Sequence, residues 1–476
     1  MDSLKHNLSK PETAAKLLFV LLSLALLAAG MLGSSLGEGG DSTTHYLYAK
    51  LSWQNPSYFF NHWAKPLFTT LSSPFAQFGI KGIILFNILC TIAAAYMATC
   101  TAKVLRFNYY YLTGIIVITM PLLLPVTLSG LTEPLSALLI ILAVYSYLNN
   151  KIVLSLLIAS FLPFVRSEGL IIAGVFGALL LAEKRWLYIP ILAAGHLFYA
   201  LIGWAFYQDF WWVFTKIPYA TMSSVYGQGN WTHFINQLYF CVQPFTFAMM
   251  LVALVYLLIE WVQKGWKMHW PKVFLIYGIV LAFVAAHSAF WALGIFNSMG
   301  LNRVLVSIFP VCGVMAMQSI HALTEKFNNQ PKYANRFIVF FMSGILIFPL
   351  LNNPASTNFK ESIYANKQHQ FLKDILMPYL HLNHPNTVYY FAETELGLFT
   401  GADIFKEGSW LYPGAEVPAK TMQKGEVFIF DSLLMQEERN IPLSQIRQDS
   451  TLREDTHFAL VNNQKKNTFY YLFVKQ

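Results

Sequence analysis

Charge is scarce in this sequence. Only 12% of its 476 residues are Asp, Glu, Lys or Arg, whereas 56% are hydrophobic. Soluble globular domains carry about 25% charged residues, so this composition excludes a soluble globule. Apolar runs of about 20 residues recur along the chain, and a helix of that length can cross a bilayer.

Cysteine is also scarce. The four cysteines all lie in apolar segments, at Cys90, Cys100, Cys241 and Cys312. This excludes a disulfide framework and a metal site with the usual cysteine spacing. The net charge of +8 does not indicate nucleic-acid binding, because the basic excess collects in one set of loops, as membrane orientation requires.

The apolar runs predict a polytopic α-helical membrane protein with about eleven transmembrane helices. The first span is interpreted as a retained anchor, because 33–36 is a poor context for signal cleavage. If the amino terminus is cytoplasmic, the inner segments before residue 352 hold 14 Lys and Arg and the outer segments hold 6. That imbalance predicts N-terminus in and C-terminus out. The predicted spans are 15–33, 80–101, 109–128, 134–148, 152–165, 168–182, 186–207, 238–262, 273–293, 304–322 and 336–351.

Composition divides the chain into two predicted domains. Residues 1–351 form the membrane domain, with long outer loops at 34–79 and 208–237. Residues 352–476 hold 26 charged residues and predict a small extracytoplasmic α/β or α+β domain. Its expected strands are 387–392, 426–430 and 468–474, and its expected amphipathic helix is 367–380.

The first 351 residues contain only ten acids, and their placement is uneven. Five lie in or beside inner Lys/Arg clusters. The outer five are Glu38, Asp41, Glu133, Glu168 and Asp209. Arg166 and Arg303 also lie at outer helix ends. Charges at membrane depth are costly unless they line a wet or protein-enclosed cavity, so these loops predict a shared cavity near the outer leaflet.

Each of these residues also has an ordinary structural explanation. Asp41 can cap the helix that follows it, and Glu133 before Pro134 suits a helix start. Arg166 and Glu168 can form a local ion pair. The remaining explanations are a solvated loop charge for Glu38, contact with lipid headgroups for Lys65 and Arg303, and interfacial packing for His45 and His62.

An outer carboxylate beside outer cations suits one reaction class. The carboxylate can act as general base toward an acceptor hydroxyl. Arg and Lys can hold a phosphate leaving group and offset its growing charge. A lipid-linked phosphosugar would present such a phosphate at the membrane surface.

Five short motifs follow one another along residues 15–310. They are Glu38-x-x-Asp41-x-x-x-His45-Tyr46, Lys65-Pro66-Leu67, Thr132-Glu133-Pro134-Leu135, Arg166-Ser167-Glu168-Gly169 and Gly300-Leu301-Asn302-Arg303. This set resembles the GT-C glycosyltransferases, which use polyprenyl-phosphate sugars, and some of the motifs resemble elements of protein O-mannosyltransferases, aminoarabinose transferases and mannosyltransferase-like members. The sequence departs from the family pattern, because Glu38 and Asp41 are three apart rather than adjacent and Lys65 is followed by one proline rather than two. We therefore assign no branch.

The resemblance implies a hexosyltransferase, with mannose as one candidate sugar, acting outside the cytoplasm of a bacterial inner or plasma membrane. The donor would be a polyprenyl-phosphate sugar and the acceptor a protein, a glycolipid or a cell-envelope glycan. Asp41 would be the base, supported by Glu38. The donor phosphate and sugar would be bound by Lys65, Arg166, Arg303, Glu133, Glu168, His45 and His62. No cofactor and no metal ligands are expected, although a divalent ion is left open.

Two other functions fit a protein of this kind. A flippase or transporter would place its charges near the midplane on broken helices within inverted repeats, and neither pattern is seen here. A polysaccharide polymerase or ligase also has long outer loops with arginines, and it would transfer whole lipid-linked glycans rather than one sugar.

Overall fold

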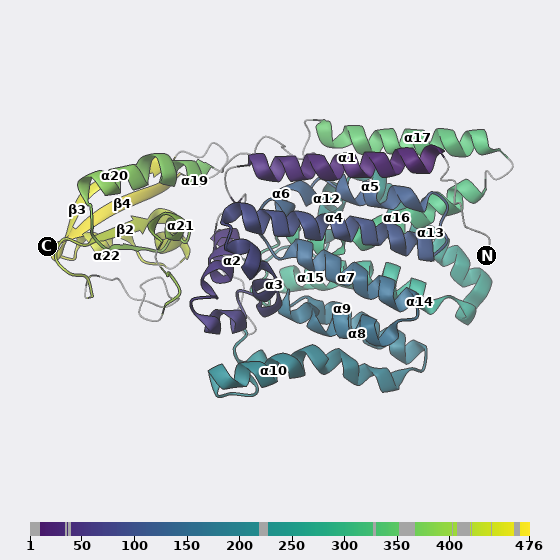
Figure 1. The fold of residues 1–476 in the computed structure, drawn as a ribbon, viewed down its shortest axis with the longest axis horizontal. Coiled ribbons are helices and arrows are strands. Elements are labelled where there is room, and N and C mark those ends of the chain that lie inside the picture. Colours follow the sequence, from purple (N-terminus) through teal and green to yellow (C-terminus); the bar gives the residue numbers. More distant parts are fainter. Residues whose placement is uncertain are drawn as a thin grey trace.

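The computed structural model describes most of the chain, namely residues 10–33, 36, 40–218, 227–326, 330–351, 367–401, 403–406, 419, 421–438, 440–460 and 467–476. Glu38, proposed above as a partner of Asp41, lies outside the described residues. A bundle of long helices forms the larger part, and a small sheet domain lies beyond one end of it (Figure 1). The chain is a polytopic helical membrane protein with a C-terminal mixed sheet.

Seven helical stretches of the described residues are long and apolar enough to cross a membrane. Several lie side by side along the horizontal of Figure 1. They are α1 (Lys10–Leu32), α4 (Ile80–Val104), η4 with α10 (Trp186–Ala193 and Ala194–Tyr207), α13 with η5 (Pro244–Lys264 and Gly265–Lys267), α14 with η6 and α15 (Trp270–Lys272, Val273–Gly278 and Ile279–Leu293), η7 with α16 (Asn302–Ile308 and Phe309–Glu325), and α17 with η8 (Pro331–Ile347 and Phe348–Leu350).

Shorter helices complete the bundle. Three of them are apolar and 10–17 residues long. These are α7 (Glu133–Leu148), α8 with η3 (Ile152–Phe161 and Leu162–Phe164) and α9 (Gly169–Ala182). The segment 109–128 is broken into η2 (Tyr110–Leu112), α5 (Thr113–Ile118) and α6 (Leu123–Thr127).

The helices differ in how deeply they are enclosed. The most apolar window of η7 with α16 is 89% buried inside the protein, whereas those of α1 and α13 are each 17% buried. An apolar helix that protein does not cover must face lipid. Segment η7–α16 is therefore the most enclosed of these helices, and Arg303 lies in its first turn.

The predicted outer loop 34–79 is itself structured. It contains α2 (Gly40–Leu51), η1 (Pro56–Phe60) and α3 (Pro66–Ala76). Proline at the first helical position suits both η1 and α3, because that residue needs no backbone N–H partner. Nine of the twelve residues of α2 are buried, so this short helix is held by packing rather than by its own propensity.

The C-terminal domain is a four-stranded sheet with helices packed on it. The strand order is β1-β2-β4-β3, where β1 and β2 are parallel and the other pairs are antiparallel. The strands are β1 (Tyr389–Phe391), β2 (Val427–Asp431), β3 (Leu452–Leu460) and β4 (Thr468–Lys475). The helices are α19 (Lys367–Phe371), η9 (Leu372–Leu376), α20 (Met377–Asn383), α21 (Leu396–Thr400), η11 (Ser432–Glu438) and α22 (Leu443–Arg447).

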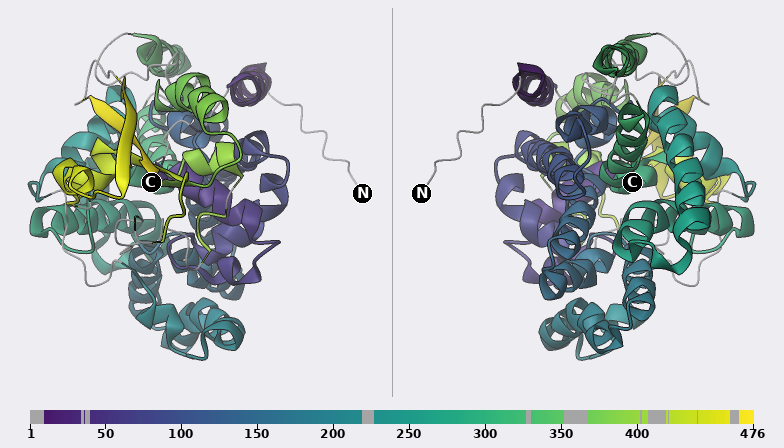
Figure 2. Two further views of the ribbon diagram at one scale, coloured as in Figure 1. Left: turned by 90° about the vertical axis from the view of Figure 1, so that its left-hand side faces the viewer. Right: turned by 90° about the vertical axis from the view of Figure 1, so that its right-hand side faces the viewer.

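The sheet domain packs directly on the membrane domain. One hydrophobic cluster joins Leu47 and Tyr58 of the outer loop to Leu396, Ile404 and Ile429 of the sheet domain. Seen end-on, the sheet domain lies in front of the bundle (Figure 2). The two parts therefore share a core at this end of the molecule.

The predicted secondary structure is largely confirmed. The expected strands correspond to β1, β2 and β4, and the expected helix at 367–380 corresponds to the run α19–η9–α20. Strand β3 was not predicted. Its residues alternate between exposed and half-buried positions, as in an edge strand with one charged face, and Arg453, Asp455 and His457 mask its apolar pattern. The count of eleven spans, the orientation and the boundary at 351/352 remain predictions, and residues 352–366 lie outside the described residues.

The orientation leads to a labelling prediction. Lys424 lies in an exposed turn before β2, and Lys151 lies in the exposed turn between α7 and α8. We expect a membrane-impermeant maleimide to label Lys424→Cys in intact cells and Lys151→Cys only after permeabilisation. The parent chain is a low-background control, because three of its cysteines are buried and the fourth is half-buried. Labelling of Lys151→Cys in intact cells would reverse the orientation.

Candidate active site

Charged side chains from four distant segments meet at the end of the bundle that faces the sheet domain (Figure 1). Glu133 Oε1 lies 2.6 Å from Arg166 Nη1 and 3.6 Å from Arg303 Nε. Arg303 also forms an ion pair with Asp41, and Arg166 Nη2 lies 2.7 Å from Glu168 Oε1. The result is a continuous ion-pair chain, Asp41–Arg303–Glu133–Arg166–Glu168.

Glu133 is the central link of this chain. Its side chain is fully buried, with 0% exposure. It lies in the first turn of α7, where the helix dipole favours a negative charge, so the helix-start explanation is also correct. Thr132 Oγ1 accepts a hydrogen bond of 3.0 Å from Arg166 Nη1. A buried carboxylate is tolerated only when paired, and two arginines provide the pairing here.

The turn Arg166-Ser167-Glu168 is set by close backbone packing. A Cβ at Gly169 would lie 2.4 Å from the carbonyl carbon of Leu162, so only glycine fits there. Burial disfavours both charges. Attraction to Arg166 outweighs burial for Glu168, and attraction to Glu133 and Glu168 outweighs burial for Arg166. The pKa of Glu168 is therefore held below its ordinary value and that of Arg166 above its ordinary value.

Lys65 lies beside this turn. Its Nζ donates a hydrogen bond of 3.3 Å to Ser167 Oγ. Burial of the ammonium lowers the pKa of Lys65 to about 8, although the nearby Glu168 carboxylate opposes the shift. The backbone of Lys65 has φ 66, a conformation that is uncommon for residues other than glycine. Strained residues of this kind cluster at functional sites.

The two predicted histidines differ in their relation to the ion-pair chain. His45 follows Asp41 by one turn on α2 and stacks on Trp63, with ring centroids 4.9 Å apart. Burial lowers its pKa to about 3, so the ring is neutral at physiological pH. His62 instead packs against Trp212, with Nε2 3.2 Å from the Trp212 carbonyl oxygen. Burial likewise lowers the pKa of His62, to about 4.

Asp41 lies at the open edge of the cluster. Its side chain is 43% exposed, against 14% for Arg303. It is in the first turn of α2, so it stabilises that helix start as well. Of the charged residues of the ion-pair chain, Asp41 is thus the one most accessible to an acceptor molecule.

Three contacting residues were not among the predicted site residues. Thr132 precedes Glu133 and Ser167 precedes Glu168 within motifs named above. Their position next to a predicted acid is the feature of the sequence that could have identified them as site residues. His287 carries no motif, and its Nε2 lies 4.0 Å from Glu168 Oε1. Nothing in the sequence relates positions 168 and 287, and only the helix packing of α9 on α15 brings them together.

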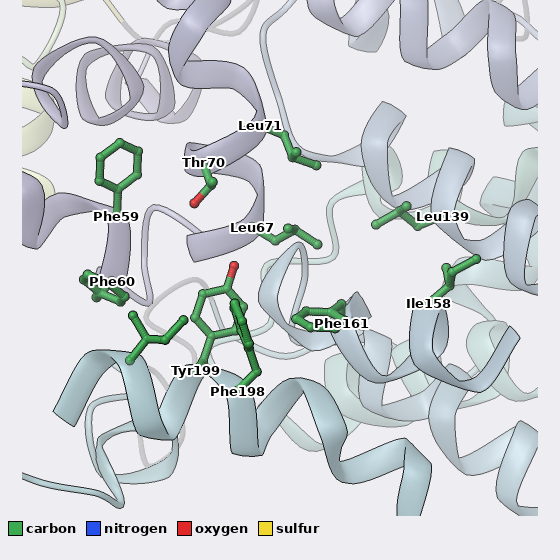
Figure 3. Close-up of a pocket in the computed structure, with 11 residues that line it drawn as sticks. Phe59, Phe60, Leu67, Thr70, Leu71, Leu139, Ile158, Phe161, Phe198 and Tyr199 are labelled. Carbon is green, nitrogen blue, oxygen red and sulfur yellow. The ribbon is translucent and has the colours of Figure 1, made fainter. Parts of the chain in front are cut away.

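An apolar pocket of about 590 Å³ lies next to Lys65 along α3. Figure 3 shows side chains from η1, α3, α7, α8 and α10 around it. Two hydroxyl-bearing residues, Thr70 and Tyr199, are its polar members. Ligand pockets of 300–1,000 Å³ are typical of small-molecule and lipid sites. The lining residues are Phe59, Phe60, Leu67, Thr70, Leu71, Leu139, Ile158, Phe161, Phe198, Tyr199 and Ile202.

Within the described ranges, no three His, Cys, Asp or Glu side chains are arranged to hold a metal ion. The acids of the ion-pair chain face arginines instead. A cluster of this kind suits recognition of an anion with hydroxyl groups nearby.

Comparisons with known proteins give a match at the level of fold. No family model matches the sequence, and no curated protein matches it. Among solved structures, the crystal structure of ArnT from Cupriavidus metallidurans bound to undecaprenyl phosphate matches with a TM-score of 0.61 and 12% sequence identity. The match covers 96% of this chain and 98% of that chain. At this identity the likeness shows a shared fold, and the resemblance expected from the sequence is confirmed at the level of the fold alone.

The central position of Glu133 predicts a large loss of stability on its removal. Glu133→Gln keeps the shape but leaves Arg166 and Arg303 with one anion fewer, which costs about 3–5 kcal/mol for a buried pair. The measurement is denaturant or thermal unfolding of the detergent-solubilised protein. Glu325→Gln is the matched control, because the Glu325 side chain is 54% exposed beside His321, and it should cost about 0.5 kcal/mol or less. Equal stability of the two variants would contradict the central role of Glu133.

Proposed function

We propose that this protein is a glycosyltransferase that moves a single sugar from a polyprenyl-phosphate donor to an acceptor hydroxyl on the extracytoplasmic face of the membrane. The observation that carries this proposal is the ion-pair chain, with Lys65 beside it at the start of a helix that lines an apolar pocket. The likeness to ArnT, a structure bound to undecaprenyl phosphate, supports the same donor class.

In this proposal the cations hold the donor phosphate. Lys65, Arg166 and Arg303 come from three different outer segments and converge on one cluster. Arg binds phosphate oxygens through two parallel N–H donors, and Lys adds a compact charge. As the bond between the anomeric carbon and the phosphate oxygen breaks, negative charge grows on that oxygen, and the three cations would stabilise it.

The apolar pocket would take the donor's hydrocarbon tail. Leu67, Thr70 and Leu71 of α3 line the pocket, and α3 begins directly after Lys65. One short helix thus runs from the proposed phosphate ligand to the proposed tail site. A lipid phosphate likewise has a charged phosphate followed by a hydrocarbon chain.

Asp41 would accept the proton of the acceptor hydroxyl as its oxygen attacks the anomeric carbon. In the structure Asp41 is paired with Arg303. A bound donor phosphate would offer Arg303 a second anion. Asp41 would then be released from Arg303 and would face the acceptor hydroxyl when the substrate is present.

The finer assignments belong to the same proposal. Glu133 and Glu168 would orient Arg166 and Arg303 or contact sugar hydroxyls, and neutral His45 would contact the sugar from α2. Mannose is the first sugar to test. The membrane domain would comprise residues 1–351 and the outer domain residues 352–476, with the site on the side of the outer domain.

The test of this function is turnover by an Asp41 variant. Purified protein in lipid is supplied with a labelled polyprenyl-phosphate hexose and isolated membranes as the source of acceptor, and transfer of label out of the donor lipid is measured. Asp41→Asn should lower kcat about 10²- to 10⁴-fold, the usual contribution of a general base. Asp209→Asn is the control. Asp209 only caps a local turn through Trp211 N and Thr215 Oγ1, and asparagine caps equally well.

Two results would contradict the proposal. Normal turnover by folded Asp41→Asn would exclude Asp41 as the base. Transfer of glycans of many sugars, rather than one, would assign the protein to the polymerase or ligase class.

Lys65 gives the reaction a predicted pH limit. Its pKa of about 8 means that the ammonium is charged below that pH and neutral above it. We expect kcat/KM for the donor, which reports the free enzyme, to fall as the pH rises through about 8. Lys65→Arg stays charged throughout this range and should remove the fall. An unchanged profile in Lys65→Arg would assign the titration to another group.

A further inference from the structure

We propose that the sheet domain is a positioning element of the reaction site, and that Phe405 and Asp403 fix the orientation of α2 and so aim Asp41. This inference rests on the proposed function for the role of Asp41. The contact itself stands on the geometry of the described residues. Neither Phe405 nor Asp403 is placed in the ion-pair chain, so both would act through α2 and η1 rather than on substrate.

The contact begins with a stack of two aromatic rings. Phe405 lies parallel to Tyr48, with ring centroids 3.7 Å apart and planes at 10°. It also meets Tyr58 edge-on, at 5.8 Å and 83°. Phe405 comes from the segment after α21 in the sheet domain, whereas Tyr48 and Tyr58 belong to the first outer loop. Aromatic pairs of this kind contribute beyond the area that they bury.

Tyr48 is the residue through which this stack can act on Asp41. Positions 41, 45 and 48 are related by steps of four and three along α2, so their side chains share one face of the helix. A contact that fixes the rotation of Tyr48 about the helix axis therefore fixes the direction of Asp41 and His45. The distance from Tyr48 to Asp41 along the helix is short, because α2 has only 12 residues.

Asp403 strengthens the same contact. The Tyr58 hydroxyl donates a hydrogen bond to the Asp403 carboxylate, whose two oxygens lie 3.0 and 2.9 Å away. Asp403 Oδ1 also accepts a 3.1 Å hydrogen bond from the backbone N–H of Phe405. One carboxylate thus connects η1 to the turn that presents Phe405. Hydrogen bonds to a charged acceptor are the stronger ones in proteins.

A second set of contacts reaches the beginning of α2. Thr394 Oγ1 donates to the carbonyl oxygen of Gly40 at 3.4 Å, next to Asp41. A Cβ at Gly397 would lie 3.2 Å from Leu47 Cδ1, so the backbone of α21 lies close to the middle of α2. The sheet domain therefore contacts α2 at its first residue and again at Leu47 and Tyr48, two turns further along. Helices of this length are marginal alone, and α2 depends on such packing.

Most of the proposed donor site lies on other elements. Lys65 lies just before α3, and the pocket residues Leu67, Thr70 and Leu71 lie on it. The rest of the pocket lining comes from helices of the bundle, apart from Phe59 and Phe60 of η1. Loosening α2 at Phe405 should therefore misplace the base without removing the donor's binding groups. A misplacement of about 1 Å can cost about 10²-fold in rate.

The experiment compares Phe405→Ala with Phe458→Ala in the full-length protein in lipid. Phe458 is a matched control: it is also a half-buried phenylalanine of the sheet domain, but it packs on Tyr379 and Phe371 within that domain. Phe405→Ala should lower kcat about 10- to 100-fold with little change in KM for the donor. Phe405→Tyr keeps the ring and should restore kcat. Phe458→Ala should keep both constants near those of the parent.

Hydrogen–deuterium exchange of residues 40–51 gives a second measurement that needs no turnover. Phe405→Ala should speed exchange in this peptide, and Phe458→Ala should not. Unchanged exchange in Phe405→Ala, or equal losses in the two alanine variants, would overturn the positioning role. If the parent protein transfers no sugar, the exchange result still decides whether the sheet domain holds α2, so failure of the proposed function stays distinguishable.

Discussion

The pairing of buried Glu133 with two arginines is the constraint on which the charged cluster at the sheet-domain end of the bundle depends. A carboxylate with no exposure cannot stay ionised without cations beside it, and cations at membrane depth are equally costly alone. Arg166 and Arg303 reach Glu133 from separate segments. The start of α7, the turn before α9 and the start of η7 must therefore assemble together, because each brings a charge that only the others can compensate.

This assembly has a consequence for substrate binding. The cluster contains three acids and three bases, so it is close to neutral before a substrate arrives: Asp41, Glu133 and Glu168 against Lys65, Arg166 and Arg303. A phosphate adds negative charge to this balanced set. The acid with the most exposed side chain, Asp41, is the one that can give up its partner at the least cost. Neutral His45 on the same helix face can hydrogen-bond to a sugar without disturbing this balance.

Much of this arrangement could be predicted from the sequence because two strong signals coincide. Long apolar runs indicated a polytopic helical protein, and the rarity of acids among them singled out Asp41, Glu133 and Glu168. The pairings could not be predicted, since they depend on how helices pack. Nothing in the order of residues places Arg303 between Glu133 and Asp41, or His287 near Glu168. Phe405 carries no motif at all, and its importance is visible only where its ring meets Tyr48.

The backbone conformation of Lys65 is not the one that would give the protein its greatest stability. The residue adopts φ 66 and ψ 97 immediately before Pro66. For an L-amino acid this backbone conformation is strained and destabilising. Glycine would occupy that conformation without steric cost, yet it would carry no ammonium group. The fold thus retains local strain at the position of the proposed phosphate ligand. If Lys65 binds the donor phosphate as proposed, selection for a more heat-resistant protein at this position would work against selection for that role, a trade-off between stability and activity.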